Sequence, residues 1–339
     1  SSMGYEAKVK GVKRGMSIPE IKIVCPEVIL IPSDYELYSL MSVRMFNIVR
    51  RYTPDVEEYS IDECFADIKG MRRPLRMSYD DIVTNVKKDL ERELGTSFSV
   101  GLAANKVLAK IASDWEKPSG LTIMPLYEAH NFLKQIPTED IWGIGRQTGA
   151  FLRKYKINTA LDYAHQSEEW IYSKMTKPHQ EIWQELNGEM IYTLDSKEKT
   201  EYQSISKVKT FSPASSNFAY VFSQLSKNIE NACMKARRYK LAAKEFAFFL
   251  KTQEFRFKGM KVKLSRPSAI PTELVAIARE RFPYLFDPHT EYRSTGAILA
   301  ELEDQPEAIQ FDLFSDVQKT YKFMKIYEGV DRAREKHGK

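Results

Sequence analysis

Two stretches in the first third of the chain place apolar residues three and four positions apart, which is the period of an amphipathic helix. The first covers residues 34–49, and Ser33 or Asp34 can cap it. The second covers residues 79–94 and stops at Gly95. We expect the two buried faces to consist of Leu37, Leu40, Met41, Met45, Ile48 and Val49, and of Ile82, Val83, Val86, Leu90 and Leu94.

Short runs of strand-forming residues lie between and after these helices. Residues 56–68 are typical of a hairpin with a polar centre, and residues 97–103 and 121–124 are typical of single strands. The segment 105–120 between those strands has the period of a helix. This order predicts helices packed on one face of an antiparallel sheet, an α+β layer. Residues 128–195 are expected to be helical.

The strongest alternation of apolar and polar residues lies between residues 245 and 265. It predicts a hairpin that turns at Lys258-Gly259 and has one apolar and one basic face. We expect Phe255, Phe257, Val262 and Leu264 on the apolar face, and Arg256, Lys258, Lys261 and Lys263 on the basic face.

The composition is that of a globular protein with two to four domains. The chain has 339 residues, of which 43% are hydrophobic and 29% charged. It contains no run of about 18 apolar residues, so we expect no membrane span. Three scattered cysteines without a CxxC pair argue against a disulfide framework or a zinc site, and favour a reducing cytoplasm.

Charge is distributed unevenly along the chain. The net charge is +5, but residues 201–266 contain 14 Lys and Arg against only four acids. This segment therefore carries +10 and leaves −5 for the rest of the chain. Such segregation predicts a domain that faces a polyanion, most commonly nucleic acid. The alternative is a basic surface that serves solubility alone.

Two neighbouring acids, Asp62 and Glu63, stand in the centre of the predicted hairpin. Neighbours in a regular strand point to opposite faces, so their carboxylates can converge only if the chain turns there. Convergent carboxylates repel each other unless a cation lies between them, and Mg²⁺ accepts one or two carboxylates together with substrate phosphates. The alternative is a solvated turn.

Three lysines lie on or just after the next helix, at Lys106, Lys110 and Lys117. Their positive charges suit a triphosphate. The alternative is that they form an ordinary solvated face of the helix.

Three motifs resemble those of the Y-family translesion DNA polymerases, in that family's order and spacing. They are "GYEAKVKGVKRGM" at 4–16, "YSIDECFAD" at 59–67 and "SVGLAANKVLAKIASDWEKPSG" at 99–120. The segment "QFDLF" suggests the bacterial, UmuC-like or DinB-like branch. The resemblance implies an α+β multidomain polymerase right hand, with a ferredoxin-like palm, small fingers, a helical thumb with a helix-hairpin-helix, and an α/β little-finger domain. The implied domains are partial fingers at 1–34, palm at 35–127, thumb at 128–200, little finger at 203–303 and a C-terminal tail at 304–339.

The resemblance also implies roles for individual residues. Asp62 and Glu63 would bind two Mg²⁺ ions in the palm, and Glu63 would also position or deprotonate the primer 3′-hydroxyl. Tyr5, Lys8 and Lys117 would hold the nucleotide. Lys8 stands where the family usually has Arg, which keeps the charge but loses bidentate geometry.

One family feature is missing from the sequence. The family begins with a strand of the form D-x-D-x-F-[FY], which carries the first metal-binding Asp, and nothing upstream of Tyr5 matches it. We expect this strand to be absent from the sequence as given rather than from the natural protein. The chain as given would then not complete a two-metal site and would be inactive alone.

Further segments resemble parts of the family that hold DNA. Gly143, Ile144 and Gly145 lie between helical stretches and resemble a helix-hairpin-helix, whose glycines let a phosphate approach; a plain turn between helices is the alternative. The segment "QSISKVKTF" resembles the start of the little finger. The residues expected near phosphates there are Lys207, Lys209, Arg256, Lys258, Lys261 and Lys263.

Residues 310–314 resemble the Q-x-[DS]-L-F peptide that docks in the bacterial sliding clamp. Leu313 and Phe314 would fill a pocket, with Gln310 at its rim and Asp312 also in contact. The alternative is that this segment packs against the protein's own surface.

The resulting hypothesis is a DNA-directed DNA polymerase that extends primers opposite damaged template bases, in DNA repair and SOS mutagenesis. Its partners would be primer-template DNA, deoxynucleoside triphosphates and the sliding clamp. We expect a monomer in the bacterial cytoplasm, associated with the nucleoid and not with a membrane. One alternative is a non-catalytic relative that binds DNA and clamp. Another is a nucleotidyl cyclase, which the basic segment 201–266 disfavours.

Overall fold

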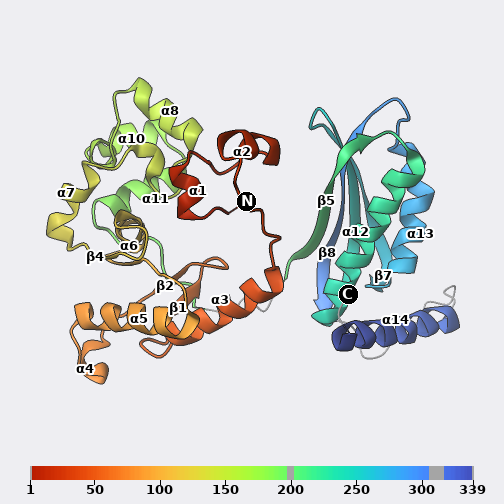
Figure 1. Cartoon of the computed structure of the whole chain (residues 1–339), viewed down its shortest axis with the longest axis horizontal. Coiled ribbons are helices and arrows are strands. Elements are labelled where there is room, and N and C mark those ends of the chain that lie inside the picture. Colours follow the sequence, from red (N-terminus) through yellow and green to blue (C-terminus); the bar gives the residue numbers. More distant parts are fainter. Residues whose placement is uncertain (1, 197–201, 305–316, 338–339) are drawn as a thin grey trace. The chain divides into compact units, whose positions relative to one another are not determined.

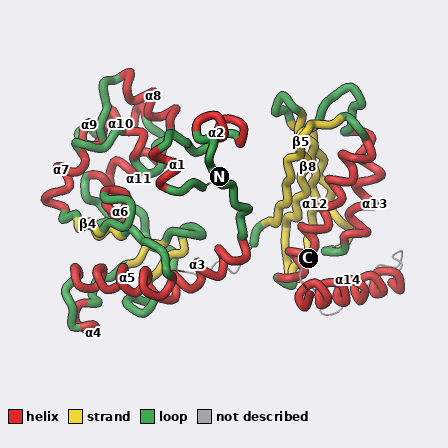
Figure 2. The backbone as a smooth tube through the Cα atoms, viewed as in Figure 1, coloured by secondary structure: helices red, strands yellow, loops and turns green. Residues whose placement is uncertain are grey.

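The computed structural model of the chain describes residues 2–196, 202–304 and 317–337. The chain divides into two compact units, Ser1–Glu198 and Lys199–Lys339 (Figure 1). Helices and short strands make up the first unit, and a sheet backed by helices makes up the second (Figure 2). This confirms the expected α+β multidomain class. Within the described ranges, no helix has the length and apolar character needed to cross a bilayer.

Two short helices open the first unit. They are α1 (Tyr5–Val9) and α2 (Ile18–Val24), and a capping box starts the second. Together they enclose a small cluster formed by Val12, Ile21 and Cys25, each at most 5% exposed. This segment therefore has a core of its own.

The two predicted helices of the first third are confirmed as α3 (Tyr35–Val49) and α5 (Tyr79–Leu94). At the start of α3, the Leu37 amide donates a hydrogen bond of 3.0 Å to the Asp34 carboxylate, so Asp34 is the cap. At the end of α5, Gly95 adopts the left-handed conformation, with a φ of 65°.

The buried face of α3 is shorter than the pattern predicts. Leu37 and Leu40 are 51% and 49% exposed, so their predicted burial is wrong. Among the described side chains of α3, the buried ones begin at Ser42, so the core lies against the second half of the helix. The core shared by the two helices contains Met45, Phe46, Ile48, Val49, Ile82, Val86 and Leu90.

The predicted hairpin is confirmed by strands β1 (Val56–Glu58) and β2 (Cys64–Ala66). The strands are antiparallel, with Glu58 opposite Cys64, and residues 59–63 form the tip. A short helix, α4 (Arg72–Leu75), follows before α5.

The second strand pair of this unit runs parallel, not antiparallel as expected. Strands β3 (Val100–Leu102) and β4 (Leu121–Ile123) are joined by α6 (Lys106–Trp115). Because α6 returns the chain to the beginning of the sheet, both strands run in the same direction. β1–β2 and β3–β4 are separate two-stranded sheets.

Helix α6 lies directly on the backbone of β3 at Gly101. A Cβ atom added to Gly101 would lie 2.3 Å from the Ser113 nitrogen and 2.4 Å from the Ala109 oxygen. Real Cβ atoms do not approach backbone this closely, so only glycine permits the contact. The face of α6 turned toward the core consists of Val107, Leu108, Ile111 and Ala112.

The predicted helical character of residues 128–195 is confirmed. Its helices surround a core with Leu152, Tyr163 and Ile171 fully buried. They are α7 (Ala129–Leu133), α8 (Arg146–Lys154), α9 (Ala160–Ala164), α10 (Glu168–Lys174) and α11 (Lys177–Leu186), with 3₁₀ turns η1 (Leu126–Glu128) and η2 (Thr138–Asp140).

A buried carboxylate joins this helical region to α6. Glu185 is 0% exposed and accepts hydrogen bonds from the backbone amides of Val107 (2.9 Å), Ile191 (3.1 Å) and Tyr192 (2.7 Å). Asn105, which caps α6, donates to the Glu185 carbonyl oxygen at 2.7 Å. A carboxylate bonded to the first amides of a helix is favoured by their positive end, so the start of α6 is fixed.

The second unit contains one four-stranded antiparallel sheet in the order β5-β8-β6-β7. One face of this sheet is covered by α12 and α13, whose apolar side chains pack against it (Figure 1). The opposite face has no helix from the described part of this unit packed on it (Figure 2). The elements are β5 (Ser204–Ser215), α12 (Phe218–Arg238), β6 (Leu241–Thr252), β7 (Phe257–Ser268), α13 (Pro271–Arg281), η3 (Phe282–Tyr284), β8 (Tyr292–Asp304) and α14 (Val317–His337).

The β6–β7 hairpin forms as predicted, but its turn lies earlier in the chain. β6 ends at Thr252 and β7 begins at Phe257, so residues 253–256 make the turn. Gly259 is paired inside the sheet. Because the chain does not turn at Lys258-Gly259, side chains continue to alternate between the two faces of the sheet through these residues.

The faces of the hairpin therefore differ from the prediction at four positions. Phe255 and Phe257 are 59% and 62% exposed, and Lys251 Nζ lies 4.7 Å from the centre of each ring. Arg256 lies in the turn, and Lys258 falls on the side that faces the helices. The inward positions of Val262 and Leu264 and the outward positions of Lys261 and Lys263 are as predicted.

Helix α14 is attached to α12 by Arg237. Its Nε and Nη2 atoms donate to the Asp331 carboxylate at 2.6 and 2.9 Å. Its Nη1 atom donates to the Ala269 carbonyl at 2.8 Å, and the guanidinium lies 4.8 Å from the centre of the Tyr327 ring. One arginine thus joins three segments of this unit.

Replacing Gly101 by alanine tests the contact between β3 and α6. We expect Gly101→Ala to lower the free energy of unfolding by about 3 kcal/mol, because the added methyl group meets backbone that cannot move aside. Chemical denaturation followed by circular dichroism measures this loss. Gly145→Ala is the matched control, since a Cβ there meets no atom within 4 Å. Equal stability of the two variants would contradict the contact.

Candidate active site

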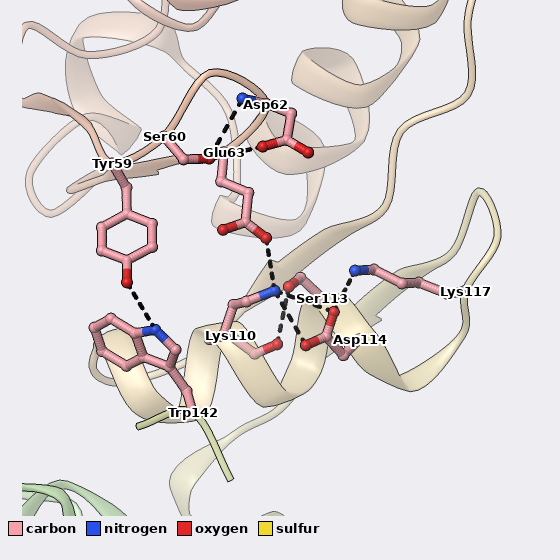
Figure 3. A network of polar contacts seen from close by, with 9 residues as sticks. All are labelled: Tyr59, Ser60, Asp62, Glu63, Lys110, Ser113, Asp114, Lys117 and Trp142. Carbon is pink, nitrogen blue, oxygen red and sulfur yellow. Dashed lines mark hydrogen bonds and ion pairs between the residues drawn. The ribbon is translucent and has the colours of Figure 1, made fainter. Parts of the chain in front are cut away.

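The tip of the β1–β2 hairpin turns sharply and carries both acids. Ser60 donates from its backbone nitrogen to the Glu63 carbonyl at 2.9 Å, which closes the tip. The Ser60 hydroxyl donates to the Asp62 carboxylate at 2.7 Å. Glu63 extends from the tip toward α6, while Asp62 lies on the Ser60 side (Figure 3). The predicted turn is confirmed, and the two carboxylates leave it with different partners.

Helix α6 presents a lysine to Glu63. The Lys110 Nζ atom lies 2.9 Å from a Glu63 oxygen and 3.1 Å from an Asp114 oxygen one helical turn further on. Lys117, just beyond the helix, is also paired with Asp114. The ion pairs therefore run in the order Glu63, Lys110, Asp114, Lys117 (Figure 3).

The two inner groups, Lys110 and Asp114, have shifted pKa values. Burial alone would lower the pKa of Lys110, but the hydrogen bond to Glu63 and the charge of Asp114 outweigh it and raise this pKa. Burial alone would raise the pKa of Asp114, but Lys117 and Lys110 outweigh it, so this pKa lies below its usual value. Both groups are ionised at neutral pH.

Lys106 has a different role from the other two lysines. Its ammonium is paired with Glu57 of β1, donates to the Thr193 carbonyl at 2.8 Å and lies 5.4 Å from the centre of the Phe65 ring. Glu57 also accepts from the Asp195 amide at 2.8 Å. Lys106 therefore joins the hairpin to α6 and to the segment after α11, and it is not turned toward Glu63.

An aromatic cluster attaches the hairpin tip to the helical region. Trp142 donates from Nε1 to the Tyr59 hydroxyl at 3.0 Å. The Tyr59 ring lies 5.4 Å from those of Phe65 and Trp142, and Trp142 lies 5.7 Å from Tyr192. These residues were not among the predicted site residues. Nothing in the spacing of the sequence indicates contacts between positions 83 residues apart.

Tyr5 and Lys8 meet each other on α1. Lys8 Nζ lies 6.0 Å from the centre of the Tyr5 ring, and Tyr5 is 46% exposed. The helix thus presents an aromatic ring and a cation together. Their approach to Asp62 and Glu63 stays a prediction.

The Gly143-Ile144-Gly145 segment leads into α8. Gly143 has a φ of 87°, and a Cβ there would lie 2.7 Å from Ile182. Gly145 is the N-cap of α8 and open to its surroundings. Ile144 is only 3% exposed, so its side chain belongs to the core, and its backbone amide donates to the Ile141 carbonyl at 2.9 Å.

The basic residues predicted in the second unit do not share one face. Lys261 and Lys263 lie on the face of the sheet opposite α12 and α13. Lys207 and Lys209 have the same parity along β5 as buried Ile205, so they project to the helix side at the edge strand. The six residues expected near phosphates therefore do not lie on one face of the sheet, and their contact with DNA stays a prediction. The predicted clamp-binding residues lie outside the described part of the chain. They are Gln310, Asp312, Leu313 and Phe314.

The donor chemistry at the hairpin tip suits a hard divalent cation that substrate helps to bind. Asp62 and Glu63 supply carboxylate oxygens, and Asp62 is exposed. Across the described ranges, no three His, Cys, Asp or Glu side chains are grouped to hold a metal. Mg²⁺ is commonly held by one or two carboxylates plus substrate phosphates, so the pair fits such a site.

Sequence comparisons find relatives along almost the whole chain. The impB/mucB/samB family matches residues 1–114, and the C-terminal domain of the same family matches residues 202–313. A DNA polymerase IV of Bacillus velezensis is 29% identical over 341 residues, which cover 98% of this chain and 80% of the relative. A DNA polymerase IV of Clostridium kluyveri is 28% identical, covering 98% of this chain and 84% of the relative.

Solved structures show the same fold. A Y-family DNA polymerase chimera of Dbh and Dpo4 superposes with a TM-score of 0.72 at 22% identity, covering 89% of this chain and 86% of the chimera. DinB from Sulfolobus solfataricus superposes with a TM-score of 0.53 at 22% identity, covering 88% and 86%. The chain therefore belongs to the impB/mucB/samB family, the Y-family DNA polymerases of the DinB and UmuC type.

Proposed function

We propose that this protein is a translesion DNA polymerase that adds nucleotides to a primer 3′-end in a Mg²⁺-dependent reaction. The observation that carries the proposal is the turned hairpin tip, which bears Asp62 and Glu63 and places Glu63 beside Lys110 of α6, in a chain of this family. In the reaction the primer 3′-oxygen forms a bond to the α-phosphorus of the nucleotide, and pyrophosphate leaves with the electrons of the broken bond.

The residues of the site have separate tasks in this proposal. Asp62 and Glu63 would hold Mg²⁺, which would supply the positive charge that activates the primer hydroxyl and stabilises charge on the phosphates. Glu63 also orients that hydroxyl or accepts its proton. Tyr5, Lys8 and Lys117 bind the triphosphate, and the ammonium groups of the two lysines offset the charge of the departing pyrophosphate.

The remaining predicted segments are assigned to DNA and to a partner protein. The backbone at Gly143 and Gly145 would hold a phosphate without reading sequence. Lys261 and Lys263 would contact DNA phosphates from the open face of the sheet. Residues 310–314 would dock in a bacterial sliding clamp. We further propose a monomer that acts at the nucleoid in the cytoplasm, during DNA repair and SOS mutagenesis.

A non-catalytic relative that binds DNA and clamp is the second candidate. Its support is that no third metal-ligating carboxylate joins Asp62 and Glu63 among the described residues. The two candidates differ in one measurement, which is extension of a primed template by the protein with Mg²⁺ and nucleotides.

Removing the charge of either tip carboxylate should stop synthesis without loss of DNA binding. We expect Asp62→Asn and Glu63→Gln each to slow single-nucleotide extension about 1000-fold, because a metal ligand contributes several kcal/mol to the transition state. Rapid-quench kinetics measures the rate, and fluorescence anisotropy measures DNA affinity. Asp80→Asn, an exposed acid on α5, is the matched control. Extension at the wild-type rate in both variants would exclude the assigned roles.

The open face of the second unit should supply salt-dependent DNA affinity. We expect the double variant Lys261→Gln/Lys263→Gln to reduce the slope of log affinity against log salt by about 1.8, since each phosphate contact contributes about 0.9. Lys207→Gln/Lys209→Gln is the matched comparison on the other side of the sheet. Anisotropy titrations at several salt concentrations check both. A larger change in the Lys207/Lys209 variant would place the DNA on the helix side.

The clamp assignment rests on two apolar side chains. We expect Leu313→Ala and Phe314→Ala each to weaken binding to a bacterial sliding clamp about 30-fold, because buried anchors of this kind contribute at least about 2 kcal/mol. Surface plasmon resonance with immobilised clamp gives the affinity. DNA binding by the same variants serves as the control for folding. Unchanged clamp affinity would remove the assignment.

A further inference from the structure

Glu63, one of the two proposed metal ligands, already has a cation beside it. Lys110 Nζ lies 2.9 Å from its carboxylate oxygen, and the lysine side chain is only 16% exposed. A lysine held this close offsets the negative charge of Glu63.

Lys110 has a second partner one helical turn away. Its Nζ atom lies 3.1 Å from Asp114, so the ammonium lies between two carboxylates that belong to different elements. Asp114 in turn is paired with Lys117, the proposed triphosphate ligand. The chain of four groups contains two negative and two positive charges, and Asp114 is the group that both lysines share (Figure 3).

The arrangement permits an exchange of partners without leaving a charge unpaired. If Glu63 turns to a divalent cation, Lys110 can no longer stay close to it, because two cations on one carboxylate oxygen repel each other. Lys110 still has Asp114, on its own helix at i+4 spacing. If Lys117 turns to a phosphate, Asp114 loses that partner but keeps Lys110. Each departure therefore makes the other less costly.

We propose that Lys110 is a placeholder cation, which neutralises the charge of Glu63 before metal binds and then remains paired with Asp114. Asp114 thereby couples the binding of metal at Glu63 to the release of Lys117, which then binds the nucleotide. Lys110 and Asp114 act here as positioning residues, not as ligands of the reacting groups. The inference rests on the proposed function for the identity of the metal and nucleotide sites. The alternative is that the pair of Lys110 and Glu63 only joins the hairpin to α6. The two roles predict different affinities for a divalent cation once the lysine charge is removed.

The test is binding of Mn²⁺ to the full chain, measured by electron paramagnetic resonance without DNA or nucleotide. We expect Lys110→Met and Lys110→Gln to bind Mn²⁺ about fivefold or more tightly than the wild type, because a competing cation has been removed. Lys110→Arg keeps the charge and should bind like the wild type. Lys88→Met, at an exposed lysine of α5, makes the same change in net charge away from Glu63. Adding Glu63→Gln to Lys110→Met should abolish the gain.

Unchanged or weaker Mn²⁺ binding by both Lys110→Met and Lys110→Gln, with circular dichroism like that of the wild type, would overturn the placeholder role and leave the structural pair. A gain that persists with Glu63→Gln, or that Lys88→Met reproduces, would also overturn it.

Coupling through Asp114 has its own readout. Titration of a fluorescent non-hydrolysable deoxynucleotide analogue with and without Mn²⁺ gives the factor by which the metal tightens nucleotide binding. We expect this factor to fall about fivefold in Asp114→Asn, since the shared acceptor is lost. An unchanged factor would overturn the coupling. These measurements do not require catalysis, so a protein that shows them but never extends a primer would refute the proposed polymerase activity and not the exchange of partners.

Discussion

The close packing of α6 on β3 determines where the charged groups of the candidate site lie. Gly101 lets the helix backbone approach the strand to a distance that no side chain would allow. Glu185 and Asn105 then fix the beginning of the same helix from α11. The contact between Gly101 of β3 and α6 is made by backbone atoms on both sides. Backbone atoms cannot change rotamer, so this contact sets the direction of α6. Lys110 and Asp114 lie on α6, so the direction of this helix determines their positions.

Electrostatic balance organises the site around that helix. The ion pairs from Glu63 to Lys117 alternate in sign, and each inner group has a partner on both sides. Pairs that are partly exposed contribute little to stability, so their arrangement is better explained by what they can exchange than by the fold they support. Lys106, by contrast, is held by Glu57, Thr193 and Phe65 and serves the architecture.

Local features of this protein could be predicted from the sequence, and contacts between distant segments could not. The helical period predicted α3 and α5, and the polar centre of the hairpin predicted the turn that bears Asp62 and Glu63. The direction of β4 was mispredicted because strand patterns carry no information on the pairing partner. The turn after Thr252 was missed because Gly259 looked like a turn residue yet lies within a strand. The exposure of Leu37 and Leu40 on α3 was not predicted, because it depends on how far the elements packed against this helix extend.

The rings around Trp142 have a mechanical consequence. Tyr59 and Phe65 from the hairpin and Tyr192 from beyond α11 all contact this one indole, and Glu57 binds the backbone of the same late segment. The β1–β2 hairpin and the helices after residue 128 should therefore shift as one rigid body. Any hinge motion within this unit that admits a nucleotide would then have to come from the segment built on α1 and α2, which has a separate small core.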